Sequence, residues 1–164
     1  MRTVGGLIVD PALQAEIDSF NTAYGHTIDD DALECWPDFF ADECLYQVIA
    51  RENVDRGLPA AVMYCDSRGM LADRVVALRR ANIYPEHYSR HVIGGAMITA
   101  AERGKVRCQA SYVVFQTRAD GETKIYNAGK YVDHFIRIDG VLRLARRDCI
   151  YDTHRIATLL VTPI

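Results

Sequence analysis

Apolar and polar residues alternate over long stretches of the second half of the chain. From residue 106 to 114 every second side chain is apolar, which is the period of a strand with one buried face. This apolar face consists of Val106, Cys108, Ala110, Tyr112 and Val114. Asp120-Gly121 and Asp139-Gly140 have the composition of tight turns, and the second is the stronger hairpin signal. The pattern therefore predicts an antiparallel meander.

The meander is expected to have four strands, at about 90–100, 105–118, 123–138 and 141–152. Several of them exceed the usual length of about five to six residues, so the sheet must twist and curl. Glycines at positions 94, 95 and 129 can supply the bends.

The first part of the chain carries helix signals. Asp10-Pro11 combines a capping residue with a proline at the first helical position. One apolar stripe follows, made of Leu13, Ile17, Phe20 and Tyr24. The acidic run at 29–31 should end this helix, and Asp31 with Glu34 resembles a capping box for a short second helix.

A further amphipathic helix is predicted at 66–82, with Asp66 or Ser67 as its cap. Its buried stripe is Leu71, Val75 and Leu78. Arg74 lies beside this stripe, so its stem can pack while its head finds a carboxylate. Shorter strands are expected at 44–50 and 58–64, on either side of a polar loop.

Helices followed by a long curled sheet indicate an α+β fold in which the helices pack on one face of the sheet, giving a cone. With 164 residues, the chain is long enough for one core and too short for two ordinary domains. We expect one domain over residues 1–164, with tails at 1–10 and 153–164. The second tail is apolar, so it should dock on its own fold or on a partner.

Composition excludes several classes of function. Hydrophobic residues make up 49% and charged residues 25% of the chain, and the net charge is -3. A negative balance argues against nucleic acid as the main partner. No apolar run reaches the roughly 20 residues that span a bilayer, and the first residues lack a secretory signal. The cytoplasm is the expected location.

Neither the cysteines nor the histidines predict a metal site. The five cysteines are odd in number and lack C-x-x-C spacing, which favours reduced, mostly buried thiols. His87 and His91 stand four apart with Glu86 beside them, and such ligands suit a non-haem iron. In a strand, however, positions four apart are separated by roughly 13 Å. We therefore expect His91 to hydrogen-bond at the sheet edge or in the cone, and His87 to be solvated.

Two further sets of residues are candidates for function. The interior of the cone can form a pocket suited to acid–base chemistry, although aromatic residues that face a cone are more often simple core packing. Its candidate lining is Tyr24, Trp36, Phe40, Tyr46, His91, Tyr112, Tyr131 and Asp148. Arg143 and Arg147 share a face of the last strand with apolar residues, which suggests, together with Arg74, a subunit interface; a solvated outer face is the alternative.

The order of residues from Tyr64 to Gly94, with Arg51–Leu58 just before it, resembles the small (beta) subunit of aromatic-ring-hydroxylating dioxygenases. The similarity is greatest to subunits serving benzoate-, salicylate- or terephthalate-type substrates. The resemblance implies an NTF2-like (cystatin-like) fold and an assembly of three large and three small subunits. It also implies that the large subunit carries a Rieske [2Fe-2S] cluster and a mononuclear iron, supplied with electrons from NAD(P)H through a reductase.

In that assembly the small subunit would hold the trimer together and support the large subunit. No cysteine here has a histidine two or three positions later, so the chain cannot itself ligate a Rieske cluster. Two alternatives remain open from the residues alone. One is a stand-alone NTF2-like lyase or isomerase that uses His, Asp and Tyr in the cone; the other is a module that binds a small hydrophobic ligand there.

Overall fold

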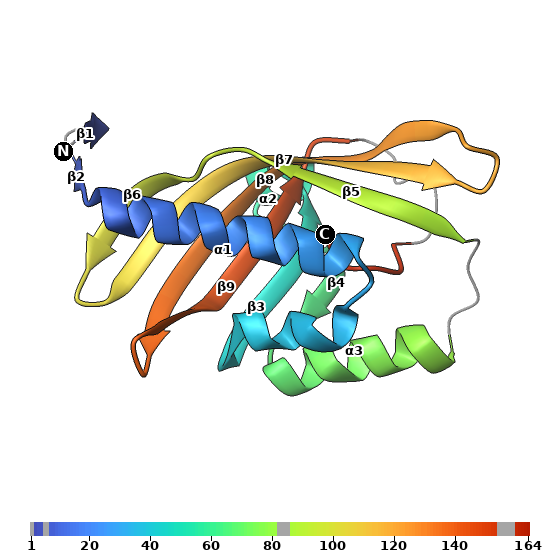
Figure 1. Ribbon diagram of the computed structural model, residues 1–164, viewed down its shortest axis with the longest axis horizontal. Helices are drawn as coiled ribbons and strands as arrows, with labels where there is room; N and C mark the ends of the chain where they lie inside the picture. The colour runs from blue at the N-terminus through green and yellow to red at the C-terminus, as the bar shows by residue number, and fades with distance from the viewer. Residues whose placement is uncertain (1, 5–6, 82–85, 154–159) are drawn as a thin grey trace.

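The computed structural model describes residues 2–4, 7–81, 86–153 and 160–164 (Figure 1). Its helices are α1 (Pro11–Asp29), the 3-10 helix η1 (Leu33–Phe39), α2 (Arg51–Asp55) and α3 (Arg68–Arg80). Its strands are β1 (Arg2–Val4), β2 (Leu7–Val9), β3 (Phe40–Ala50), β4 (Ala61–Cys65), β5 (His87–Ile93), β6 (Met97–Glu102), β7 (Lys105–Arg118), β8 (Thr123–Ile138) and β9 (Val141–Tyr151). The predicted loop at 51–57 thus contains the short helix α2, and the predicted tail at 1–10 contains the antiparallel pair β1–β2.

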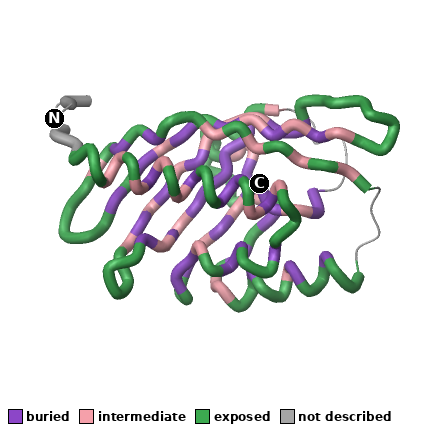
Figure 2. The backbone as a smooth tube through the Cα atoms, in the orientation of Figure 1, coloured by how far each residue is buried: buried purple, intermediate pink, exposed green. Residues whose placement is uncertain are grey.

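The large sheet has the order β4-β3-β9-β8-β7-β5, and β6 also pairs with β7. It curls around α1, whose inner side packs against the strands (Figure 1). Buried residues follow the inner face of the sheet and the facing side of the helix (Figure 2). The predicted α+β cone is therefore confirmed. Its parallel contact between β3 and β9 was not predicted, because no local pattern signals which distant strands become neighbours.

The predicted strand at 90–100 is two strands, β5 and β6, that pair with successive parts of β7. Between them, Gly94 N–H donates to the Ser111 carbonyl at 2.8 Å. Ala96 N–H donates to Asp18 Oδ1 at 2.8 Å, and Gln14 Nε2 donates to the Ala96 carbonyl at 2.8 Å. Side chains of α1 thus replace ladder hydrogen bonds at this break.

Two of the predicted caps are confirmed and one is wrong. Asp10 accepts a hydrogen bond from Ala12 N–H, and Ser67 accepts one from Met70 N–H. The capping box of Asp31 and Glu34 is absent: Ala32 is the N-cap of η1 and makes no side-chain cap bond. Both carboxylates instead bind Arg79.

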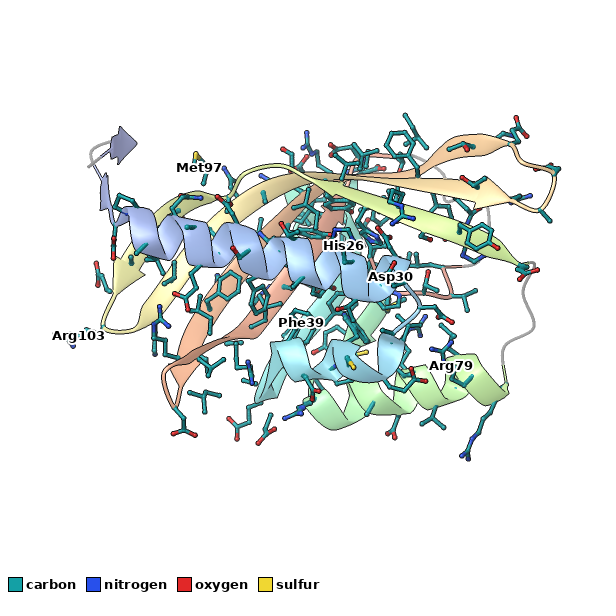
Figure 3. All side chains as sticks on the ribbon, viewed as in Figure 1. His26, Asp30, Phe39, Arg79, Met97 and Arg103 are labelled. Carbon is teal, nitrogen blue, oxygen red and sulfur yellow. The ribbon has the colours of Figure 1, made fainter. Side chains whose placement is uncertain are left out.

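Arg79, labelled on α3 in Figure 3, links α3 to η1 through Glu34 and to the turn before η1 through Asp31. Its Nε lies 2.8 Å from Glu34 Oε1, and its Nη1 lies 2.7 Å from Asp31 Oδ2. The hydrogen bond from Arg79 lowers the pKa of Glu34 from 4.5 to about 2. A carboxyl with a lowered pKa in the folded state stabilises the fold above its unfolded pKa, and loses this effect as the pH falls through the folded value.

We expect Arg79→Met to be less stable than the unmodified chain above about pH 4.5, and the difference to shrink steadily as the pH falls toward 2. Urea denaturation at a series of pH values measures it. Arg80→Met, at the neighbouring exposed position, is the matched control. A stability difference that does not depend on pH would contradict the role assigned to Glu34.

The predicted stripe of α3 is confirmed, since Leu71, Val75 and Leu78 are all buried. Arg74 beside it is half-buried, but within the described part of the chain its head bonds backbone carbonyls and not the expected carboxylate. Its Nη2 donates to the carbonyls of Leu160 and Val161, at 3.0 and 3.4 Å. The far end of the chain thus docks on its own fold; residues 154–159 of the predicted tail lie outside the described residues.

Candidate functional site

The aromatic residues predicted to line a pocket do meet inside the cone, but they pack against one another. Trp36 and Tyr46 are 5.1 Å apart between ring centroids, at an interplanar angle of 85°. Tyr112 and Tyr131 stack at 4.3 Å. The fully buried aromatic residues of this cluster are Tyr24, Trp36, Phe40, Tyr46, Tyr112 and Tyr131. Edge-to-face and stacked pairs of this kind fill a core.

Ile164 occupies the centre of this aromatic cluster. Its carbonyl oxygen accepts hydrogen bonds from Tyr24 Oη at 3.0 Å and Tyr46 Oη at 3.2 Å, and its N–H donates to Tyr46 Oη at 2.9 Å. Trp36 Nε1 in turn donates to Tyr24 Oη at 3.0 Å. Burial raises the pKa of Tyr46 well above 10.0, so its hydroxyl stays a donor at neutral pH. The hydroxyls of Tyr24 and Tyr46 thus find their hydrogen-bond partners within the chain itself.

Arg147 also lies inside the cone, where sequence reasoning did not place it. Its side chain is fully buried and bonds Asp133 twice, through Nε at 2.9 Å and Nη2 at 2.8 Å. Nη2 also donates to Asn21 Oδ1 at 2.6 Å. The guanidinium lies between the rings of Tyr24 and Tyr131, at 4.1 and 4.2 Å from their centroids. The predicted role of Arg147 at a subunit interface is wrong, because its own chain covers it completely.

A β-bulge in β9 is the reason that the sequence pattern misplaced Arg147. Phe135 pairs with Leu144 and His134 pairs with Arg146, so Ala145 is an extra residue in β9. An extra residue reverses which later side chains face inward. Arg147 therefore faces the interior of the cone, on the same side of β9 as Leu144. Strict alternation would place these two residues on opposite faces.

Asp148 is turned out of the cone by the same bulge. Its carboxylate accepts from Arg146 Nε at 2.8 and 3.0 Å and from Gln47 Nε2 at 2.8 Å. The Arg146 side chain is 40% exposed, as suits the outer face. Asp148 is therefore a wrong member of the predicted pocket.

His91 lies on β5, as predicted, and connects this edge strand to the end of α1. Its Nδ1 is 2.6 Å from Asp29 Oδ1, and its backbone N–H donates to Asp29 Oδ2 at 2.8 Å. Both side chains are almost completely buried. His87 lies four residues earlier on the same strand and is half-buried, so the helical arrangement that would bring both rings to one ion is absent.

The third predicted interface residue, Arg143, is half-buried near the start of β9. It borders a hollow of about 530 Å³ whose lining includes Phe20, Phe39 and Val141. Of the three arginines assigned to an interface, Arg143 keeps a surface position next to apolar side chains.

The donor set does not fit an iron centre or an iron–sulfur cluster. Among the residues that the structure describes, no three His, Cys, Asp or Glu side chains are grouped so that they could hold a metal ion. Cys44, Cys65, Cys108 and Cys149 are buried free thiols, and burial raises the pKa of Cys108 to about 12 and that of Cys44 to about 11. Thiols of this kind are poor ligands and poor nucleophiles at neutral pH.

Comparison with known proteins gives the family. The model of the ring hydroxylating beta subunit family matches residues 25–158. The chain belongs to this family. The small subunit of anthranilate 1,2-dioxygenase from Burkholderia cepacia is 46% identical over 144 residues, which are 88% of this chain and 89% of that protein. Subunit beta 2 of the terminal oxygenase component of terephthalate 1,2-dioxygenase from a Comamonas species is 40% identical over 151 residues, covering 92% of this chain and 98% of that one.

A solved structure agrees with this beta subunit over nearly its full length. It is a crystal structure from Novosphingobium aromaticivorans, assigned as the beta subunit of an aromatic-ring-hydroxylating dioxygenase. It is 68% identical, with a TM-score of 0.87, and the alignment covers 93% of this chain and 97% of that chain. The resemblance seen in the sequence is thus confirmed, as is its NTF2-like fold. None of the helices that the structure describes combines the length and apolar character needed to cross a bilayer.

Sequence reasoning missed three residues that organise the cone: Asn21 and Asp133 hold Arg147, and Ile164 accepts hydrogen bonds from two tyrosines. Gly129, which was expected only to allow a bend, lets β8 and β9 approach closely. Asn21 and Asp133 each interrupt an otherwise apolar inner face. A polar residue at such a position is the signal by which the sequence could have revealed them.

Proposed function

We propose that this beta subunit is a structural component of a dioxygenase that acts on a monocyclic aromatic carboxylate such as benzoate. It would assemble as three small and three large subunits, in the cytoplasm, and would itself self-associate as a trimer. The large subunit would carry the Rieske [2Fe-2S] cluster and the mononuclear iron, and a reductase would bring electrons from NAD(P)H. The names of the anthranilate and terephthalate relatives support this substrate class, because each of those compounds is a benzene ring bearing a carboxylate.

The filled interior of the cone is the observation that carries the non-catalytic role. The aromatic residues suggested as a pocket lining belong, together with Ile164, to one buried hydrophobic core. Asp148, one member of the acid–base set suggested for a lyase, faces outward with Arg146. These two features favour a supporting role over the lyase or isomerase alternative, and over a hydrophobic ligand in the cone.

Contact with other subunits is proposed for the outer surface. Arg143 and the exposed apolar residue Val141, next to the 530 Å³ hollow, combine arginine with apolar area, which is typical of the centre of protein interfaces. Arg74 is used internally by the carbonyls of Leu160 and Val161, so it is not part of this proposed surface.

Reconstitution with the large subunit tests the supporting role. The variants are Tyr24→Phe and His91→Asn, which remove a hydroxyl and a ring nitrogen from the two places where this chain could do acid–base work. We expect complexes of unchanged size and iron content whose turnover of benzoate per iron stays within about twofold, because general acid–base catalysis contributes far more, about 10²–10⁴-fold. Fully assembled, iron-replete complexes without turnover would disprove the structural role.

A further inference from the structure

The two edge strands of the large sheet present alternate side chains to the outside of the cone. The sheet runs from β4 at one edge to β5 at the other (Figure 1). On β5, Tyr88 is 68% and Val92 is 55% exposed, and the side chain of Arg90 between them is 60% exposed. On β4, Val62 and Tyr64 are 52% and 51% exposed. Within the described part of the chain, one face of each edge strand is thus left uncovered.

The exposed face of β5 continues across β7 onto β8. Arg90 pairs with Phe115 of β7, which pairs in turn with Ile125 of β8. Side chains of directly paired residues lie on the same face of a sheet, and Ile125 is 62% exposed. We call this face the β5 surface; it consists of Tyr88, Arg90, Val92, Phe115 and Ile125. Aromatic residues and arginine with little other charge are typical of the centre of a protein interface.

The exposed face of β4 has similar apolar area and the opposite charge. Met63 and Cys65 point into the core, where they are 3% and 2% exposed, and Val62 and Tyr64 alternate with them. Asp66 directly follows the strand, two residues after Tyr64, and is exposed, as expected for a position on the same side of an extended chain. We call this face, made of Val62, Tyr64 and Asp66, the β4 surface. Its charge is negative, whereas the charge of the β5 surface is positive.

Both edge strands are poorly suited to pairing their backbones with another chain. The N–H of His91 on β5 donates to Asp29 Oδ2 of α1 at 2.8 Å, so a helix side chain occupies part of that edge. On β4, the register with β3 shifts at Val62, which is an extra residue. Bulges and coverage by other elements are means by which proteins block edge-to-edge pairing. Contact at these two edges therefore has to use the outward side chains.

We propose that the β5 surface of one copy of this chain packs against the β4 surface of the next, and that three copies close into a ring. The inference rests on the proposed self-association as a trimer and specifies where its contacts lie. Each copy in a ring of three touches its two neighbours through two different surfaces, and the opposite edges of one sheet supply them.

The charges favour this head-to-tail contact over contact between identical surfaces. Packing two β5 surfaces together would place Arg90 of one copy against Arg90 of the other, and like charges in contact oppose association. The β4 surface offers Asp66 instead, whose carboxylate can accept both hydrogen bonds of a guanidinium. The hollow beside Arg143 belongs to neither surface and is left for the large subunit.

Exchange of the two charges tests the ring, with sedimentation equilibrium of the chain by itself as the measurement. Arg90→Glu and Asp66→Arg each place like charges across the contact, so each should raise the concentration of half-assembly by about tenfold or more. The double variant Arg90→Glu, Asp66→Arg restores opposite charges and should form trimers as the unmodified chain does. An equimolar mixture of the two single variants should form fewer trimers than the double variant, because any ring of three places two identical variants side by side.

Two further variants separate the contact from local damage. Arg90 Nη1 lies 3.9 Å from Asp29 Oδ2, so Arg90→Glu could disturb its own strand. Tyr88→Asp introduces a negative charge at a more exposed position of the same surface and should weaken the trimer equally. Arg103→Glu, at an exposed position in the turn before β7 (Figure 3), is the matched control and should leave assembly unchanged. Circular dichroism checks that every variant is folded.

The outcomes distinguish this inference from the proposed function. Trimers that persist in all three single variants, or a double variant that does not reassemble, would overturn the inference and leave the proposed self-association intact. A chain that stays monomeric at every concentration would overturn both. Variants that form normal trimers but no longer bind the large subunit would overturn the inference and assign these surfaces to the large subunit. Turnover enters none of these readouts, so they are independent of the reconstitution experiment.

Discussion

Asp133→Asn is expected to lower the free energy of unfolding by about 3–5 kcal/mol, the usual effect of removing one partner of a buried ion pair. Asp133 and Arg147 are both completely buried. Burial alone would lower the pKa of Arg147, but the charge and hydrogen bonds of Asp133 outweigh this and raise that pKa well above its usual range. The guanidinium therefore stays charged, and without Asp133 its charge is uncompensated. Urea denaturation monitored by the fluorescence of the buried Trp36 measures the loss.

Two controls separate the ion pair from general damage to the core. Asp148→Asn, which weakens a pair with the half-exposed Arg146, should cost clearly less, because water screens the charge of Arg146. The double variant Asp133→Leu, Arg147→Met should recover much of the stability, because apolar residues can replace a buried pair at little cost. If Asp133→Asn proved as mild as Asp148→Asn, the pair would not hold the cone together.

Gly129→Ala is expected to destabilise the chain by about 3 kcal/mol or more, at or above the upper end of ordinary overpacking. A Cβ at position 129 would lie 2.0 Å from the Ile150 carbonyl oxygen and 2.7 Å from Tyr151 Cα. Both are backbone atoms of β9, so no side-chain rotation can relieve the clash. Relief requires β8 and β9 to separate at the centre of the sheet, where Gly129 pairs with Tyr151.

Gly95→Ala is the matched control, because a Cβ there would meet nothing within 4 Å. Its melting temperature should stay within a few degrees of the unmodified value, since surface changes of this kind are usually within about 0.5 kcal/mol. A folded Gly129→Ala variant with the same melting temperature as the Gly95→Ala variant would show that close contact between β8 and β9 is not required.

Alternation and helical periodicity are local, and the features that depend on them were predictable. The strands at 105–118 and 123–138 have the predicted bounds, and the inner stripes of α1 and α3 are buried largely as expected. The six aromatic candidates for a pocket lining are buried inside the cone, where they pack as core. Their burial follows from the sequence because the apolar faces of the helix and the sheet have to meet. The break between β5 and β6 was partly anticipated, because Gly94-Gly95 marks a bend, although the helix side chains that hold it were not.

The sequence by itself thus determined the class of fold, the family and which residues are apolar enough to form a core. Only the tertiary structure decided the parallel pairing of β3 with β9, the extra residue at Ala145 that turns Arg147 inward and Asp148 outward, and the docking of Ile164 among the tyrosines. Each of these joins segments far apart in the chain, and its energy comes from contacts formed only after the sheet has curled. Local patterns carry no information about such contacts, because a one-residue shift in register exchanges the two faces of a strand.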